Sequence, residues 1–582
     1  MAELELRRRQ YWEVLVTWKD VAGTPATEER LVEVASQMNA GAAITVLSGL
    51  GTILNNRRGD AAKRAADQVS AATEFFPKDV ADRVLEMFKQ KTRHRWLHEE
   101  QLLAAMRLLI LHGKAGPVDH PPDRQSFAEL LLGINDVILR LGLPGETPEQ
   151  EGVRMVLRSL GMLASEQERY AIPRLQDLLL VRARAHADEL GALDLDALFQ
   201  RATGGLTASE YVAAALIYVG PFTGIVDVQT LAASNYRHIL AAYEGKYRDP
   251  GKMKASAEHF VGTIAWFRER FAAQEPRPLA YWDYLPFKQR PLIRIEETGS
   301  PIPVSFSYLL QKLATGVYFL LENQARLDDP DHGVQRFRGF FGKLFEEYSQ
   351  DALRRTYAPI AGATFIPENA ITGGGKKPDA VIQQSSSMVV IESTVTALSD
   401  AAIVASDPIA FEREISSKHR AKVDQLRESI EGLVSGRLVA PGVDMAAIRE
   451  IIPVILLLYP FPTMAFTLKP LREAIGQGPI GASHIEMRTL TLMSAEELEM
   501  IEPVITSGAI SLPTILRRKA ESAATNDTSL KNFLLSEGMP GSSENPNMKE
   551  LYDARLKSPE VREALHSLFV FDDEVPPVQP SS

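Results

Sequence analysis

The spacing of apolar residues predicts that the first half of the chain is helical. From residue 4 to about 290, segments such as LVEVASQM, VADRVLEMFKQ and FAELLLGINDVILRLG carry apolar residues at i, i+3, i+4 and i+7, the pattern of one buried helix face. Gly, Pro and Asp interrupt this pattern near 116–123 and 143–151. We therefore expect residues 1–290 to form a helical accessory or recognition region of one or two domains, followed by a helical connector over 291–330.

The pattern changes between about 331 and 505, where short β-branched and apolar runs alternate with amphipathic segments. The order αβββαβ indicates an α/β domain around one mixed sheet, so we expect a multidomain α and α/β protein. The pattern and composition of residues 506–582 predict a small helical appendage with a flexible, Pro- and Ser-rich tail. The elements expected in the α/β domain are a helix over 334–357, strands over 363–367, 378–384 and 388–396, a helix over about 409–433, strands over 451–460 and 485–492, and a helix over 494–501.

Composition limits the chemistry that the chain can perform. The 582 residues predict about four domains, and 45% apolar with 24% charged residues is typical of globular proteins. The absence of cysteine excludes disulfides, Cys-ligated zinc, iron–sulfur clusters and thiol nucleophiles. With only 11 His, a metal site is expected to use oxygen ligands and a hard cation. The charged start MAELELRRRQ and the lack of an apolar run of about 20 residues predict a cytoplasmic protein without membrane contact.

Acidic residues outnumber basic residues by 75 to 64, which gives a net charge of −11. The molecule as a whole therefore does not attract a polyanion. A local basic cleft can still do so, because electrostatic steering depends on the local field rather than on the total charge.

Asp379 and Glu392 stand out because each lies in a short run of mostly apolar residues. If Ser385 and Ser386 form a two-residue hairpin loop, Asp379 lies directly opposite Glu392, with Cβ atoms about 4.5–5.5 Å apart. Carboxylates this close repel unless a proton or a cation lies between them, and a divalent cation is the simplest solution. Two alternatives stay open. Ser-Ser is a poor type I′ turn, and a three-residue loop would move Glu392 to the other face unless a bulge corrected it. The spacing also fits two acids that are simply solvated residues at the edge of a sheet.

The surrounding segments resemble the PD-(D/E)xK nuclease superfamily, which has the restriction-endonuclease-like fold. The resemblance covers about 331–505 through LFEEY on the leading helix, KKPDAVI and VVIEST on strands, KVDQL on the next helix and the buried strand PVILLL. It implies that Asp379 and Glu392 are the paired metal-binding acids. It also implies that Glu346 is an additional acid, that Gln425 is a polar residue of the site, and that Mg²⁺ or Mn²⁺ is the cofactor.

The motif lysine of this superfamily falls at Thr394, whose hydroxyl supplies no positive charge. Either another lysine replaces it, as happens within the superfamily, or the site is inactive. Lys418, Lys422 and Gln425 lie at i, i+4 and i+7 and share one stripe of the next expected helix. We expect Lys422 or Lys418 to replace the missing lysine, and the alternative for both is a solvated helix face.

Lys376 and Lys377 follow three glycines in GGGKKPD, which lacks the Gly-Lys-Ser/Thr ending of a phosphate-cradling loop. They are expected either to approach a nucleic-acid backbone or to form an ordinary exposed turn.

The resemblance implies a metal-dependent nuclease that hydrolyses phosphodiester bonds in DNA, or less readily in RNA. A large helical region beside such a domain is similar in layout to bacterial restriction and phage-defence proteins, which is an analogy of architecture. One alternative is an inactive nuclease-like scaffold or nucleic-acid-binding module. Another is a nuclease gated by a partner or ligand of the helical region. The sequence leaves the oligomeric state open, a homodimer included.

Overall fold

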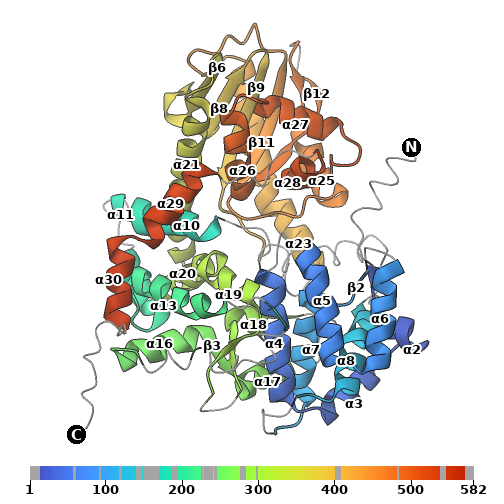
Figure 1. Ribbon diagram of the computed structural model, residues 1–582. Helices are drawn as coiled ribbons and strands as arrows, with labels where there is room; N and C mark the ends of the chain where they lie inside the picture. The colour runs from blue at the N-terminus through green and yellow to red at the C-terminus, as the bar shows by residue number, and fades with distance from the viewer. Residues whose placement is uncertain are drawn as a thin grey trace.

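The computed structural model is a mixed α and β protein in which a sheet domain lies beside a larger helical part (Figure 1). Short, capped helices account for most of the chain, and the largest sheet is built from residues between 363 and 494. The residues that the structure describes are 14–56, 61–90, 94–116, 121–138, 147, 170–186, 194–223, 227–228, 240, 246–274, 283–295, 299–399, 408–480, 484–537 and 545–569.

The sheet domain follows the expected order of a helix, three strands, a helix and a strand. Its main elements, in chain order, are α21 (Gly333–Tyr357), β6 (Ala363–Pro367), β7 (Thr372–Gly373), β8 (Ala380–Gln384), β9 (Ser387–Thr394), α23 (Pro408–Glu414), a π-helical segment (Ile415–His419), α24 (Arg420–Val434), β10 (Leu438–Val439), β11 (Glu450–Leu457), α25 (Ala465–Ile475), β12 (Gly478–Pro479), β13 (Glu486–Met487), β14 (Thr491–Ser494) and α26 (Ala495–Thr506).

The large sheet is mixed, with strand order β12-β13-β11-β9-β8-β6 and with β14 also paired to β11. Strands β6, β8 and β9 are antiparallel neighbours, whereas β11 runs parallel to β9. Parallel neighbours need a crossover connection, which the helical segment from α23 to α24 provides. Pro453, which lacks a backbone donor, lies in β11 between the part that pairs with β13 and the part that pairs with β14.

Helices cover both faces of this sheet. Val389 and Ile391 of β9 belong to the core that contains α21 and α26, whereas Val390 belongs to the core under α24 and α25. Successive side chains of a strand point to opposite faces. Glu392 and Thr394 therefore share the face of Val390, on which α24 packs.

Helices dominate the chain before the sheet domain, but two small sheets interrupt them. The strands are β1 (Val14–Leu15) and β2 (His94–Arg95) in one sheet, and β3 (Val261–Thr263), β4 (Leu292–Arg294) and β5 (Ile302–Pro303) in the other. The helices include α2 (Trp18–Ala22), α3 (Glu28–Gln37), α4 (Ala40–Asn56), α5 (Ala61–Phe75), α6 (Lys78–Gln90), α7 (Glu99–His112), α8 (Arg124–Ile138), α10 (Ala171–Gln176), α12 (Leu195–Thr203), α13 (Ala208–Val219), α16 (Pro250–Phe260), α17 (Ile264–Ala272), α18 (Leu285–Gln289), α19 (Phe306–Leu313) and α20 (Thr315–Asp328).

The expected helical connector differs from the structure, and the expected breaks in the helical region lie largely outside the described residues. The segment 291–330, expected to be entirely helical, begins with the strands β4 and β5, and its helices α19 and α20 follow. The expected break at 143–151 lies outside the described residues apart from position 147, and so do positions 117–120 of the break at 116–123.

One continuous apolar core joins the helical part to the sheet face under α21 and α26. A buried ion pair crosses the same junction, because Arg174 of α10 donates from Nε to Oε1 of Glu499 on α26 over 2.6 Å. The hydroxyl of Tyr348 on α21 donates to the same oxygen over 2.6 Å. The helix that leads into the sheet is thus held by both parts of the molecule.

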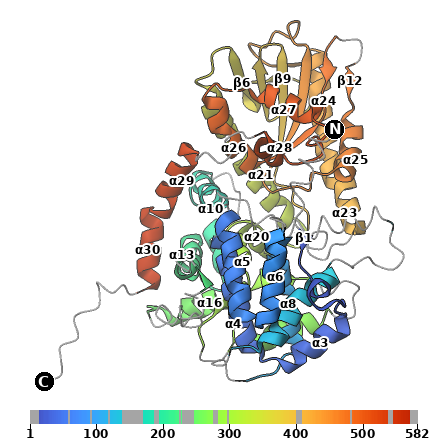
Figure 2. The ribbon, with the colours of Figure 1, turned by 45° about the vertical axis from the view of Figure 1, so that its right-hand side comes forward.

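The last four described helices are α27 (Leu512–Glu521), α28 (Leu530–Ser536), α29 (Pro546–Leu556) and α30 (Pro559–Leu568). Helix α27 contacts β9 and α28 contacts α26 of the sheet domain, whereas α29 and α30 lie against the helical part. Helix α29 contacts α10, and α30 contacts α13. Figures 1 and 2 show α29 and α30 running down one side of the molecule. The tail expected to be flexible lies outside the described residues from 570 onward.

Among the described helices, none combines the length and the apolar composition needed to cross a bilayer.

Candidate active site

The hairpin of β8 and β9 has the register expected from a two-residue loop. Ala380 pairs with Ile391, so the next position places Asp379 opposite Glu392 at the end of the antiparallel ladder. The prediction of this register is confirmed. Glu392 is fully buried and Asp379 is 9% exposed, which contradicts the alternative that both are solvated edge residues.

The loop departs from the expected turn chemistry. Ser385 has a φ of 56°, and it is the only non-glycine with positive φ among the described residues, so the turn is not type I′, which requires positive φ at both central positions. Side-chain and tertiary contacts hold it instead. Gln383 Nε2 donates to the carbonyl oxygen of Ser385 over 3.0 Å, and Arg449 N donates to that of Ser386 over 2.8 Å.

Asp379 is fixed by the backbone around it. Its Oδ2 accepts from the amide of Ser393 over 2.5 Å, and its carbonyl oxygen accepts from Gln350 Nε2 over 3.1 Å. The same amide nitrogen of Gln350 donates to Oε1 of Glu346 over 3.0 Å. Gln350 thereby aligns α21 with the start of β8 and holds Glu346 beside Asp379.

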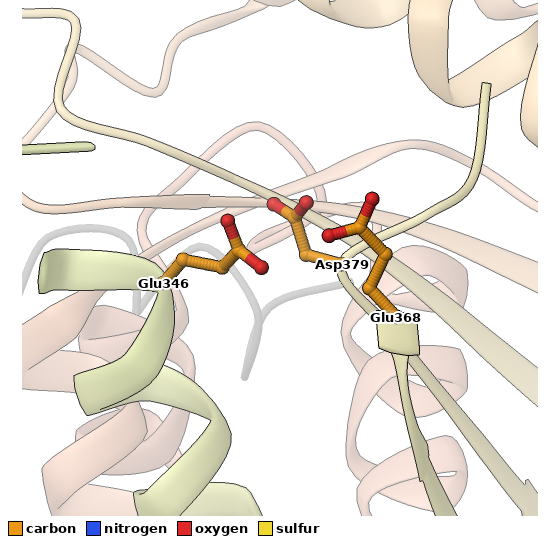
Figure 3. A group of neighbouring side chains, drawn as sticks. All are labelled: Glu346, Glu368 and Asp379. Carbon is orange, nitrogen blue, oxygen red and sulfur yellow. The ribbon is translucent and has the colours of Figure 1, made fainter. Parts of the chain in front are cut away.

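A third acid, Glu368, completes a carboxylate cluster that the sequence analysis did not include. Oxygens of Glu346, Glu368 and Asp379 all lie within 4.8 Å of one another. Figure 3 shows Glu346 and Glu368 pointing toward Asp379 from opposite sides. Pro367 pairs with Ala380, so Glu368 lies directly beside Asp379. The sequence signal for Glu368 is its position directly after the expected strand 363–367, which pairs with the strand that follows Asp379.

Lys422 is the lysine that reaches the acids. Its Nζ donates to Oε1 of Glu392 over 2.8 Å and lies 3.5 Å from Oε1 of Gln425. Lys418, one turn earlier, pairs with Glu414 at 3.5 Å. Lys418 lies in the π-helical segment, and its ammonium contacts an acid on the preceding turn rather than an acid of the cluster. The two lysines thus share a cleft but have different partners.

Among the described residues, Thr394 forms no hydrogen bond to the acids of the cleft. Its Oγ1 donates to Oγ1 of Thr396 over 2.9 Å and accepts from the amide of Thr396 over 3.1 Å. The hydroxyl therefore stabilises the exit from β9. Thr394 still lines the cleft, so a longer side chain at this position would face the acids.

Every residue predicted to belong to the site lines one cleft of about 1320 Å³. Basic residues outnumber acidic residues in its lining, 7 to 6, on a chain whose net charge is −11. The predicted members are Glu346, Lys376, Lys377, Asp379, Glu392, Lys418, Lys422 and Gln425, and the cleft adds Glu368, Thr394, Glu322, Asp331, Arg326, Arg338 and Lys343 as charged or polar neighbours.

Burial and mutual repulsion make the acids of this cleft difficult to ionise. Burial, followed by the charges of Asp379 and Glu368, raises the pKa of Glu346 to about 8. Burial and the Asp379 carboxylate raise the pKa of Glu392 to about 8, although Lys422 acts in the opposite direction. Burial also raises the pKa of Asp379 to about 6, against the lowering effect of the Ser393 amide. A cation would relieve the repulsion in every case.

The donor set fits a hard divalent cation. All of the clustered donors are carboxylate oxygens, which suit Mg²⁺ or Mn²⁺. Oε2 of Glu392 is buried and has no hydrogen-bond partner among the described residues, so this oxygen remains available as a further ligand. Glu346, Glu368 and Asp379 are therefore the residues that would hold the cation, whereas Glu392, also predicted as a ligand, lies outside this cluster and is paired with Lys422.

Comparisons with known proteins give no guide to this site, because no family model, curated protein or solved structure matches the chain.

Proposed function

We propose that the protein is a metal-dependent nuclease that hydrolyses phosphodiester bonds in DNA, and less readily in RNA. The observation that carries the proposal is the position of Lys422, whose ammonium contacts Glu392 inside the same cleft as the carboxylate cluster. A lysine beside paired acids is the combination that the PD-(D/E)xK resemblance requires. The mixed sheet with its αβββαβ order supports the restriction-endonuclease-like fold as part of this proposal.

In this proposal the cation supplies the chemistry, and the acids hold the cation. When bound, Mg²⁺ or Mn²⁺ would polarise the scissile phosphate and lower the pKa of the attacking water. Asp379 is held for this task by the Ser393 amide, and Glu346 by Gln350. Glu368 adds a further oxygen to the cluster.

Lys422 supplies the positive charge that Thr394 lacks. Its ammonium is held 2.8 Å from Glu392 Oε1 and is partly open to the cleft. From this position it would stabilise negative charge that develops on the phosphate, since a fixed charge in a partly buried cleft acts without reorganisation. Gln425 lies beside Lys422 and would orient the lysine or a water through its amide.

A second candidate function is a nuclease-like scaffold without activity. Two observations favour it: Thr394 occupies the motif position, and Lys422 already pairs with the buried carboxylate of Glu392, a contact that can serve structure alone. In that case the helical part would bind a protein partner or nucleic acid. A related candidate is a nuclease that the helical part keeps inactive until it binds a partner.

The biological setting belongs to the same proposal. A large helical part joined to a nuclease-like domain is the layout of restriction and phage-defence proteins, which suggests a bacterial defence role in the cytoplasm. A homodimer is compatible with this role.

The deciding experiment is cleavage of plasmid, linear duplex, single-stranded DNA and RNA with Mg²⁺, Mn²⁺ or EDTA. We expect metal-dependent cleavage by the parent and loss of cleavage in Asp379→Asn and Glu392→Gln. Glu431→Gln, an exposed position on α24, is the matched control and should cleave like the parent. Equal cleavage by all four proteins would reject the site. No cleavage, combined with no Mn²⁺ binding in calorimetry, would favour the scaffold.

A further inference from the structure

A second cavity adjoins the catalytic cleft across helix α20. Its volume is about 400 Å³, within the range of small-ligand sites. Phe319, Glu322 and Arg326 line both cavities, and their spacing of three and four residues places them on one face of α20. This helix face is therefore the wall that the two cavities share.

The second cavity has a basic lining. Lys288, Lys312 and Arg326 contribute positive charges, and Glu322 is the only acid among its lining residues. The carboxylate of Glu322 is already engaged by Arg326 at 3.5 Å and by Arg338. The cavity thus keeps an excess of positive charge, which favours an anionic ligand.

Lys312 is the cation most affected by this crowding. It lies half-buried on α19, and its Nζ donates to the carbonyl oxygen of Gln289 over 2.9 Å. Burial, followed by the charges of Arg290 and Lys288, lowers the pKa of Lys312 to about 8. A bound anion would offset the repulsion from these neighbouring cations.

Phe319 adds an aromatic surface at the boundary between the two cavities. It is partly exposed, and Lys288 Nζ lies 5.7 Å from its ring centroid. An aromatic ring flanked by cations is the combination with which proteins bind single-stranded nucleic acid, because the ring stacks on a base while the cations contact the backbone. A duplex offers no unstacked base for this ring.

We propose that the second cavity binds a phosphate-bearing nucleotide of a single strand that continues from the catalytic cleft over Phe319 to Lys288 and Lys312. This inference rests on the proposed function and specifies it: the substrate class is nucleic acid with a single-stranded segment. The relevant chemistry is a phosphate group with an attached base. Such a group comes either from a strand or from a free nucleotide, and the experiment separates these two sources.

The test measures binding without cleavage. Fluorescence anisotropy in EDTA gives the Kd of a labelled single-stranded oligonucleotide and of a blunt duplex at several salt concentrations. The variants are Lys288→Gln, Lys312→Gln and Phe319→Leu, and the control is Lys254→Gln, an exposed position on α16 that lines neither cavity. The two lysine variants are made separately, and thermal unfolding is recorded for each, so that a folding defect in one leaves the other to decide.

We expect each lysine variant to weaken single-strand binding and to reduce the slope of log Kd against log salt by about 0.7. Phe319→Leu should weaken binding roughly 5-fold or more with an unchanged salt slope, since it removes stacking rather than charge. Duplex binding and the Lys254→Gln control should stay at parent values. Single-strand binding equal to the parent in all three variants would overturn the proposal.

Competition with ATP or inorganic phosphate identifies the source of the phosphate. Displacement of the oligonucleotide only at concentrations far above its own Kd supports a strand. Tight ATP binding that Lys312→Gln abolishes, with oligonucleotide binding unchanged, overturns the strand in favour of a free nucleotide. A failure of the proposed cleavage function does not affect this readout, because the Kd values are measured in EDTA and do not require cleavage.

Discussion

The ammonium of Lys422 on α24 lies 2.8 Å from the buried carboxylate of Glu392 on β9, 30 residues away in sequence. The contact arises because Glu392 and Val390 share one sheet face and because Val423 and Leu426 dock α24 on that face. The apolar stripe of α24 thus sets the depth at which Lys422 enters the cleft. The distinction between Lys422 and Lys418 follows from this placement and can be measured.

Replacing Lys422 should impair cleavage far more than replacing Lys418. We expect Lys422→Gln to lower kcat by roughly 10²- to 10³-fold, the usual effect of removing one preorganised electrostatic group from an active site. Lys418→Gln should stay within a few-fold of the parent, because Lys418 pairs with Glu414 rather than with the acids that we propose bind the metal. Single-turnover cleavage measures both values. Equal losses in the two variants would contradict the assignment of Lys422.

Moving the lysine to the motif position should restore part of the lost activity. Thr394 lines the cleft on the same strand face as Glu392, so Thr394→Lys in the Lys422→Gln background returns a positive charge to the acids. We expect the double variant to cleave faster than Lys422→Gln alone. Thr394→Val in the same background supplies the control, because it fills the position without charge. Equal rates in both double variants would show that charge at this position is irrelevant.

Glu368 should contribute to metal affinity although the sequence motif does not contain it. Its oxygen lies within 4.8 Å of those of Glu346 and Asp379, so Glu368→Gln removes one anionic ligand from the cluster. We expect the Kd for Mn²⁺ in calorimetry to rise by roughly 10-fold or more. Glu412→Gln, an exposed acid on α23, is the matched control. Parent-like affinity in Glu368→Gln would exclude a role as ligand.

The stability of the metal-free protein should fall as pH rises from about 5 to 8. The raised pKa values of Glu346 and Glu392, about 8 each, mean that the folded state binds more protons than the unfolded chain across this window. The free energy of unfolding therefore decreases as these acids are forced to ionise. The Tm gain from Mg²⁺ should consequently be larger at pH 8 than at pH 6. Glu346→Gln should flatten the pH dependence, and an unchanged slope would contradict this account.

Removing only one partner of the Arg174–Glu499 pair should lower the stability of the folded protein. Both side chains are almost fully buried, at 2% and 0% exposure, so Arg174→Met leaves an uncompensated carboxylate in the core. Removing one partner of such a pair costs roughly 3–5 kcal/mol. We expect a lower unfolding midpoint in Arg174→Met, and recovery of most of the loss in the double variant Arg174→Met, Glu499→Leu. A double variant no more stable than the single one would contradict the interpretation.

Local patterns were sufficient to predict the hairpin and the acids that it carries. A two-residue loop at Ser385 and Ser386 places Asp379 opposite Glu392, and the structure has this register, although the sequence left a three-residue loop open. The spacing of Lys418, Lys422 and Gln425 likewise placed both lysines on one stripe of the next helix. It could not separate Lys422 from Lys418, because the choice depends on where α24 meets the sheet.

Other features depend on contacts between distant segments. Glu368 joins the cluster through the pairing of β6 with β8, which the expected strands alone do not specify. The short strands β3, β4 and β5 have too few residues for a period of two to be distinguished from a helical pattern. The basic cavity beside α20 is likewise assembled from helices α18, α19 and α20, none of which carries a recognisable binding motif.

The contact between α13 and α30 joins two helices that are synthesised at widely separated times. These helices lie at residues 208–219 and 559–568, so the partner of α13 is among the last described parts of the chain to be synthesised. All carboxylates of the cleft have been made once residue 392 has been added, whereas α30 follows only at residues 559–568. A growing chain on the ribosome therefore carries all the acids of the cleft before the helix that contacts α13 has been made.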